Sequence, residues 1–195
     1  AVANEGGIGL IGASGMSTEE LRREIRLAKQ LAPNGIVGVN IMVAASAFID
    51  LVKVAIEEKI DLIAAGAGFS RDVFALGRAA GIPVAPIVSS AKVAKLAEKL
   101  GASFIIVEGK EAAGHLGTDR TMSEIVPEVV EAVNLPVIAA GGIIDGKDIA
   151  EALKLGAAGV QMGTRFVASE ESNAADSFKQ FYLMAEHEDV VTIKS

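Results

Sequence analysis

The stretch PVIAAGGIIDGKDIAEALKLGAAGVQMG, residues 136–163, decides the fold because it holds one complete repeating unit of the chain. Its first apolar run ends in a glycine pair, after which Asp145 is an expected N-cap for an amphipathic helix. Gly156 stands where that helix should end, and a second apolar run begins at Gly159. The order strand, turn, helix, strand is that of the βα units from which parallel sheets are built.

The same unit recurs along the chain, with apolar runs that start about 20–35 residues apart. Each run is continuous rather than alternating, which indicates strands that are buried on both faces. The predicted strands are residues 9–12, 36–42, 62–65, 84–88, 104–107, 137–140 and 159–162. Between them we expect capping boxes at Ser17 and Thr121, N-caps at Ser70, Ser90 and Asp145, and helix ends at Gly81, Gly101 and Gly156.

Seven uniform units favour a parallel (β/α)8 barrel of the TIM type over an open doubly wound sheet, because nothing marks a topological switch. A closed barrel needs eight strands, and the chain starts abruptly at Ala1 without a methionine. We therefore expect the first strand to be missing from this chain. No linker or shift of composition interrupts the repeat, so we expect residues 1–195 to form a single domain.

Charge and composition exclude several classes of function. The net charge of −7 argues against a nucleic-acid partner and against binding to anionic membranes. The chain has no cysteine, which excludes disulfides and thiolate chemistry, agrees with a reducing, cytoplasmic setting, and leaves us expecting no metal site. The apolar runs are too short to span a bilayer. We expect a small-molecule substrate and a homo-oligomer.

Glycines follow the last two predicted strands, at the positions where barrels bind phosphate. Gly141 and Gly142 follow one strand, and Gly163 and Thr164 follow the next. Glycines there let backbone N–H groups approach an anion with a helix N-terminus behind them. Each pair alone could be a tight turn, but together they favour a phosphate site.

Three polar side chains stand at the carboxyl ends of other predicted strands, where barrel chemistry takes place. His115 lies in a glycine-flanked loop and can act as a base or polariser near neutral pH, although a solvated loop histidine is the alternative. Asn40 and Glu108 each end an apolar strand, and a buried amide or carboxyl group needs a ligand or backbone partner. His187 lies in a charged stretch and is read as solvated surface.

With these residues in place, the sequence resembles the nitronate monooxygenase family, formerly called 2-nitropropane dioxygenases, and the related FMN-dependent enoyl-ACP reductases of the second type. The resemblance covers nearly the whole chain in order, and its last two motifs together are quite specific. The matching segments are residues 4–12, 38–40, 66–68, 111–115, 136–143 and 161–166.

The resemblance implies a barrel that binds FMN. By analogy with the family, Asn40, Glu108 and the backbone of Ala113 would contact the flavin. Gly141 and Gly142, with the run Gln161, Met162, Gly163 and Thr164, would hold its phosphate, and His115 would be the base or proton donor.

The sequence also departs from the family. Ala113 stands where the family usually has the first of two glycines, and Glu108 is often glutamine in the monooxygenases, whereas glutamate is more typical of the reductases. The family's first strand, with its Gly-Gly-Met turn, is missing, as is its usual C-terminal extension. The expected domain is therefore truncated at both ends relative to the family.

The leading hypothesis is a flavin enzyme that oxidises nitronates or nitroalkanes with O₂, in which His115 deprotonates a neutral nitroalkane. One alternative is an enoyl-ACP reductase that uses FMN and NAD(P)H. A second is a non-catalytic barrel fragment that needs a partner chain, since the unpaired sheet edges left by a missing strand would tend to pair with another chain. A third is an enzyme for another phosphate-bearing ligand, which would not explain Asn40 and the His115 loop together.

Overall fold

The computed structural model describes residues 1–114, 117–186, 189 and 191. The chain divides into two compact units, Ala1–Gln161 and Met162–Ser195, and each is described by itself. Among the described helices, none is long and apolar enough to cross a membrane.

The first unit is a seven-stranded parallel sheet in which every strand pairs with its neighbours in the sequence, in the order β1 to β7. A short 3-10 helix, η1 (Val2–Glu5), precedes the sheet. The strands are β1 (Ile8–Gly12), β2 (Ile36–Met42), β3 (Leu62–Gly66), β4 (Val84–Val88), β5 (Ile105–Glu108), β6 (Val137–Ala140) and β7 (Gly159–Gln161). The connecting helices are α1 (Thr18–Leu31), α2 (Phe48–Glu57), α3 (Asp72–Ala80), α4 (Ala91–Leu100), α5 (Met122–Ala132) and α6 (Gly146–Lys154).

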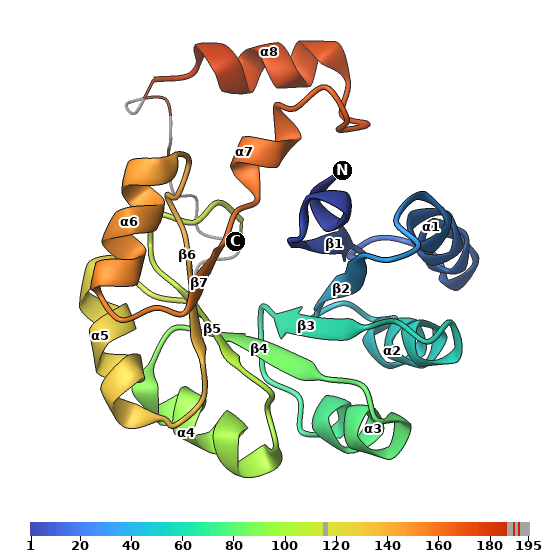
Figure 1. The fold of residues 1–195 in the computed structure, drawn as a ribbon, viewed down its shortest axis with the longest axis horizontal. Helices are drawn as coiled ribbons and strands as arrows, with labels where there is room; N and C mark the ends of the chain where they lie inside the picture. Colours follow the sequence, from blue (N-terminus) through green and yellow to red (C-terminus); the bar gives the residue numbers. More distant parts are fainter. Residues whose placement is uncertain (115–116, 187–188, 190, 192–195) are drawn as a thin grey trace. The chain divides into compact units, whose positions relative to one another are not determined.

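The sheet is curled into part of a barrel, and α1 to α6 cover its outer face (Figure 1). On the inner face, small and branched side chains from four strands, β3 to β6, form a buried cluster. The cluster consists of Leu62, Ala64, Ala85, Ile106 and Ala140, with Leu10, Ile87, Phe104 and Ile138 packed against it. The prediction of a parallel TIM-type barrel built from βα units, with seven strands in this chain, is confirmed.

Four strands differ from the prediction, by one residue at one or both boundaries. β1 begins at Ile8 rather than Gly9, and β3 ends at Gly66 rather than Ala65. β5 begins at Ile105 and includes Glu108, because the ladder to β6 continues until Glu108 is opposite Ala140. Phe104 packs against the inner cluster just before the strand starts. β7 ends at Gln161, since its pairing with β6 stops at Ala140.

The helix starts largely follow the predicted caps. Both capping boxes form, at Ser17 and at Thr121, and Asp145 accepts hydrogen bonds from two backbone N–H groups of α6. Ser90 occupies the N-cap position of α4 without a capping hydrogen bond. The prediction for Ser70 is wrong, because α3 begins one residue later and its N-cap is Arg71.

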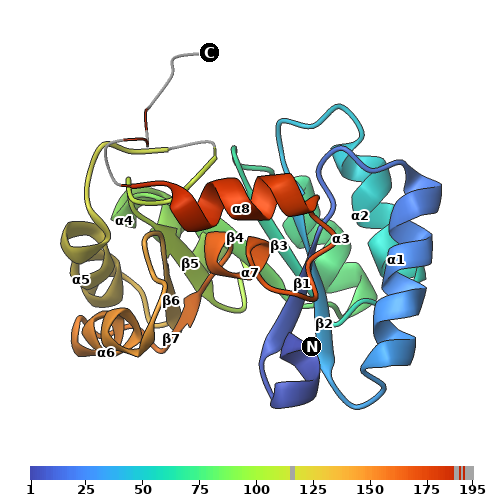
Figure 2. The same cartoon turned by 90° about the horizontal axis from the view of Figure 1, so that it is seen from above.

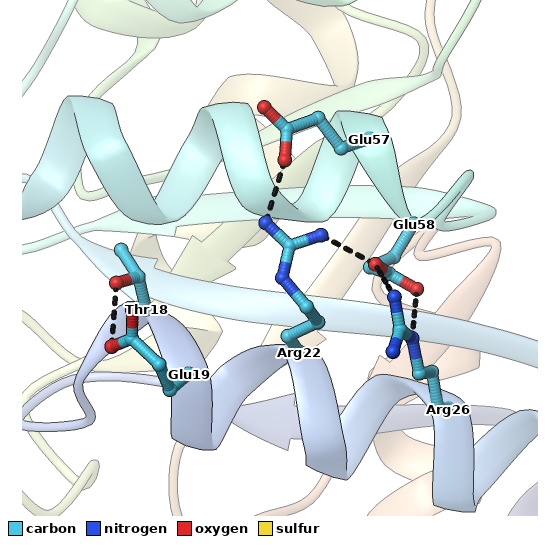
Figure 3. A network of polar contacts seen from close by, with 6 residues as sticks. All are labelled: Thr18, Glu19, Arg22, Arg26, Glu57 and Glu58. Atoms are coloured by element: carbon cyan, nitrogen blue, oxygen red, sulfur yellow. Dashed lines mark hydrogen bonds and ion pairs between the residues drawn. The ribbon is translucent and has the colours of Figure 1, made fainter.

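An ion-pair network joins the outer surfaces of α1 and α2 (Figure 3). Glu58 follows the last residue of α2, and its carboxylate accepts hydrogen bonds from Arg22 at 2.5 Å and from Arg26 at 2.8 Å. Arg22 also donates to Glu57 at 2.7 Å. The side chain of Glu58 is only 12% exposed, whereas that of Glu57 is 59% exposed. The two arginines lower the pKa of Glu58 to about 2, with the hydrogen bond from Arg26 as the largest cause.

The described part of the second unit contains two helices, α7 (Thr164–Val167) and α8 (Asp176–Met184). Phe178 and Tyr182, four residues apart on α8, pack edge to face with ring centroids 5.0 Å apart. All seven strands belong to the first unit, so the barrel part of the fold is described entirely within residues 1–161.

Candidate functional site

Three predicted site residues lie on the inner face of the sheet. Glu108 and Gln161 end their strands, whereas Asn40 lies two residues before the end of β2. Asn40 is in register with Ala64, and Ala64 belongs to the inner cluster. Glu108 and Gln161 are both in register with Ala140, which belongs to the same cluster. Partners in register on neighbouring parallel strands point to the same face. The side chains of Asn40, Glu108 and Gln161 therefore form a polar rim above an apolar floor.

One polar atom of this rim has no hydrogen-bond partner among the described residues. The side-chain oxygen Oε1 of Gln161 is buried and accepts no hydrogen bond from any described residue. A buried amide oxygen left without a donor costs about 1–3 kcal/mol. Such an atom is accounted for if a ligand supplies the missing donor, so this part of the rim fits a bound molecule with N–H or O–H groups.

Glu108 is half-buried at the end of β5, next to the apolar cluster. Loss of hydration raises the pKa of its carboxyl group above the ordinary value, because the charged form is disfavoured where water is excluded. The neutral form of Glu108 can donate a hydrogen bond, and the charged form can only accept one. Its ionisation therefore decides which kind of ligand atom it can contact.

The glycine pair after β6 adopts a backbone conformation that favours glycine. Gly141 has φ of 104° and Gly142 has φ of 69°. A Cβ atom added to Gly141 would lie 3.1 Å from the backbone nitrogen of Ala112, and one added to Gly142 would lie 2.9 Å from Cβ of Glu111. The turn is thus packed directly beneath the start of the segment that follows β5, and side chains are excluded on that side.

The segment after β5 carries the predicted base, His115, which lies outside the described residues. The described residues around it are held by hydrogen bonds to neighbouring elements. Gly109 donates to the carbonyl oxygen of Ala140 at 3.1 Å, and Lys110 donates to that of Arg120 at 2.8 Å. Beyond the undescribed pair, the hydroxyl of Ser89 donates to the carbonyl oxygen of Gly117 at 3.0 Å. Figure 2 shows the segments after β1, β2 and β5 along one edge of the first unit.

Ala113, whose backbone the family resemblance assigns to the flavin, is exposed in this same segment. Sequence reasoning did not single out Glu111 or Ser89, which fix the segment. Their contacts join residues 11 and 28 positions apart, so no local pattern signals them.

The loop after β3 contains a second unusual backbone conformation. Ala67 has φ of 50°, in the left-handed region that L-residues other than glycine, asparagine and aspartate seldom occupy. The carbonyl oxygen of Gly66, just before it, accepts a hydrogen bond of 2.8 Å from the backbone N–H of Val43. Strained residues of this kind gather at functional sites, and Ala67 lies at the carboxyl end of the sheet.

The remaining predicted phosphate ligands lie at the end of β7 and directly after it. Gln161 ends β7 in the first unit, whereas Met162, Gly163 and Thr164 belong to the second. Gly163 is the N-cap of the four-residue helix α7, and Thr164 is the first residue of that helix.

Comparison with known proteins identifies the family. The family model described as nitronate monooxygenase matches residues 36–195. A probable nitronate monooxygenase of Staphylococcus aureus (strain Newman) is 32% identical over all of this chain and 67% of its own length. A dehydrogenase of Rhodococcus jostii (strain RHA1), named (3aS,4S,5R,7aS)-5-hydroxy-7a-methyl-1-oxo-octahydro-1H-indene-4-carboxyl-CoA dehydrogenase, is 39% identical over 93% of this chain and 51% of its own.

Among solved structures, FabK from Thermotoga maritima superimposes with a TM-score of 0.93 at 42% identity. The match covers 97% of this chain and 60% of FabK. The chain thus spans about half the length of the Rhodococcus relative and three fifths of FabK. On the family model and the staphylococcal relative together, the chain belongs to the nitronate monooxygenase family, whose members are flavin-dependent oxidoreductases.

Proposed function

We propose that the protein is an FMN-dependent oxidoreductase that oxidises nitronates or nitroalkanes with O₂. The observation that carries the proposal is the polar rim of Asn40, Glu108 and Gln161, in which the Gln161 oxygen has no partner among the described residues. A flat ligand that carries both donors and acceptors suits three such groups above an apolar floor. Bound FMN would supply the redox chemistry.

The residues would divide the work of binding. Asn40, Glu108 and Gln161, together with the backbone of Ala113, would contact the flavin. Gly141 and Gly142 offer backbone N–H groups for a phosphate at the end of β6. Met162, Gly163 and Thr164 stay separate predictions for contacts to the same phosphate.

His115 would move the proton. A neutral nitroalkane must lose a proton from carbon before it becomes a nitronate, and an imidazole that titrates near neutral pH can accept it. The described residues on either side of the undescribed pair, Gly114 and Gly117, belong to the segment at the carboxyl end of β5, where the rim also lies.

A second candidate is oxidation or reduction of an acyl thioester, with NAD(P)H as the electron donor in the enoyl-ACP reductase form. The specific observation in its favour is that two relatives linked to thioesters are more identical to this chain than the probable nitronate monooxygenase is. The Rhodococcus relative, at 39% identity, is named for a CoA ester, and FabK, an enoyl-ACP reductase II, is 42% identical. Both values exceed the 32% identity to the probable nitronate monooxygenase.

The first experiment is the absorbance spectrum of the purified protein, with the mass of any cofactor released by heat. A yellow protein with flavin bands and the mass of FMN supports the proposal. A colourless, oligomeric preparation that takes up no FMN on addition contradicts it and favours the alternative of a non-catalytic fragment that needs a partner chain.

The second experiment separates the substrates. Anaerobic protein is mixed with a nitronate, or with NAD(P)H followed by an enoyl thioester, and the flavin absorbance is followed. Reduction by the nitronate and reoxidation by O₂ support the leading proposal, whereas reduction by NAD(P)H and reoxidation by the thioester support the second. In the first case, His115→Ala should lower turnover of neutral nitroalkanes by about 10²–10⁴-fold and affect preformed nitronates less. Equal, full activity on both forms would show that His115 is only a loop residue.

A homo-oligomeric state and a cytoplasmic location also remain predictions. The state is measured by light scattering of the purified protein, and the location by fractionation of the source cells.

A further inference from the structure

The carboxylate of Glu111 joins three parts of the carboxyl-end region that are separate in the sequence. Both of its oxygens lie within reach of the backbone N–H of Met122, at 3.0 and 3.3 Å. Met122 is the first residue of α5, so its N–H has no partner within the helix. The Cβ atom of the same side chain lies against Gly142.

Neighbouring residues leave room for this arrangement. A Cβ atom on Gly109 would collide with both the Glu111 carboxylate and the Met122 nitrogen, so glycine at position 109 allows the two to meet. Close by, Lys110 donates to the carbonyl oxygen of Arg120 at 2.8 Å, and Ala112 donates to that of Gly109 at 3.1 Å. The two ends of the segment between β5 and α5 are therefore fastened to each other, and Glu111 is the side chain that fastens them.

We propose that Glu111 is a positioning residue, which holds the start of the segment after β5, with Ala113, against the Gly141-Gly142 turn and so prepares the flavin site. This inference rests on the proposed function and adds a residue to which that function assigns no role. Glu111 touches the helix start and the turn rather than the reacting atoms, so its effect on the cofactor is indirect. Without its carboxylate, the segment must be ordered when flavin binds, and the free energy of binding is reduced by that ordering.

The chain offers a conservative variant and a matched control. Glu111→Gln keeps the length of the side chain and one oxygen that can accept the Met122 N–H. Glu111→Ala removes the acceptor. Glu128→Ala removes a glutamate that also ties this segment to α5, through a 2.7 Å ion pair with Arg120. That pair and the contact of Glu111 with Met122 are both exposed, but Glu128 touches neither Met122 nor Gly142. Exposed ion pairs contribute little.

The test measures two quantities in the purified protein: the FMN dissociation constant by flavin fluorescence, and hydrogen exchange at the Met122 amide in the cofactor-free form. We expect Glu111→Ala to weaken FMN binding about tenfold and to speed exchange at Met122 by a similar factor. Glu111→Gln should stay within about threefold and Glu128→Ala within about twofold of the native protein for both quantities. The thermal midpoint of the cofactor-free protein should change by less than about 2 °C in all three.

Native FMN affinity and native Met122 protection in Glu111→Ala would overturn the inference. So would an equal loss in Glu128→Ala, since the segment would then be sensitive to any change. If the native protein takes up no FMN, the proposed function fails, yet the exchange comparison still decides whether Glu111 positions the segment.

Discussion

Glu108 combines an ionisable group with a half-buried position at the end of β5, and that combination has a measurable pH signature. Burial raises the pKa of its carboxyl group in the folded protein, so folding favours the neutral form. The unfolded chain therefore loses this proton at a lower pH than the folded protein does. Stability contributed by the neutral group is complete below the unfolded pKa and is lost as pH rises through the raised folded value.

Replacing Glu108 with glutamine removes this loss while keeping the size of the side chain. We expect Glu108→Gln to be more stable than the native protein by about 0.5–1 kcal/mol at pH 7, with the difference shrinking as pH falls toward 4. Urea denaturation of the cofactor-free protein at several pH values measures it. A stability difference that does not vary with pH would show that ionisation of Glu108 plays no part.

Gly142 illustrates how two roles can meet in one residue. Its backbone is predicted to contact a phosphate, and its missing side chain leaves space for Cβ of Glu111. Loss of flavin in Gly142→Leu would therefore not separate a lost phosphate contact from a displaced segment. Retention of flavin in a folded Gly142→Leu protein would still exclude both.

At the scale of elements, α3 packs against β4 through a glycine. A Cβ atom on Gly77 would collide with the Val84 side chain and lie 2.9 Å from the carbonyl oxygen of Ile82. Val84 is the first residue of β4, and Ile82 lies in the short connection before it, held by a hydrogen bond from its N–H to the carbonyl oxygen of Gly77, so the helix would have to move outward. We expect Gly77→Ala to destabilise the protein by about 1–3 kcal/mol, as over-packing in a core does.

Gly146, the first residue of α6, is the matched control, because a Cβ atom there would meet nothing within 4 Å. Gly146→Ala should be neutral or stabilising by up to about 1 kcal/mol, since alanine favours the helix. Both variants are compared by urea denaturation. Equal effects of the two substitutions would contradict the packing argument.

The ion pairs of Glu58 stabilise the packing of α1 against α2, and this contribution to stability depends on pH. Because the folded pKa of Glu58 is about 2 and the ordinary value is 4.5, its contribution is present above about pH 4.5 and is lost as pH falls toward 2. We expect Glu58→Gln to cost about 1–2 kcal/mol at pH 7 and much less at pH 3. Urea denaturation at the two pH values measures this.

Glu57→Gln is the control for this prediction. Glu57 lies beside Glu58 but is largely exposed and has a single arginine partner, so its replacement should cost less than about 0.5 kcal/mol. If the two variants were equally destabilised, the low exposure of Glu58 would not explain its contribution to stability.

The elements also show what the sequence could and could not reveal. Continuous apolar runs followed by glycine or a capping residue were sufficient to locate all seven strands within one or two residues of their ends. They also located Glu108 at a strand end, because that position depends only on the local run. Asn40 does not end its strand as expected, since β2 continues to Met42. Ser70 was a plausible cap by residue type, but Arg71 holds the position, since serine at a turn has no fixed distance to the helix start.

Contacts between loops could not be predicted in this way. The place of Glu111 depends on the ladder between β5 and β6, which brings Gly142 beneath it from 31 residues away, and on α5 starting at Met122. The free oxygen of Gln161 likewise depends on what surrounds it in three dimensions rather than on its neighbours in the sequence.

At the scale of the whole molecule, the sheet and the second unit occupy consecutive, non-overlapping ranges of the sequence. Residues 1–161 contain all seven strands and the inner cluster, whereas Met162, Gly163 and Thr164 lie beyond them. We expect residues 1–161, expressed alone, to keep a folded βα signature by circular dichroism. We also expect at least about tenfold weaker FMN binding, because three predicted phosphate contacts are removed.

Two outcomes would speak against this division. An unfolded fragment would show that the second unit is needed for the sheet to form. A folded fragment with native FMN affinity would show that Met162, Gly163 and Thr164 do not bind the cofactor.

The left-handed Ala67 has a consequence for the denatured ensemble. Alanine at φ of 50° costs about 1–2 kcal/mol in the native state, which glycine would avoid. Glycine, however, gives the unfolded chain more freedom, worth about 0.5–1 kcal/mol in the opposite direction. The two terms partly cancel, so Ala67→Gly should raise the free energy of unfolding by at most about 1.5 kcal/mol while widening the range of conformations that the β3 loop samples. At this position, thermodynamic stability and local stiffness need not change together.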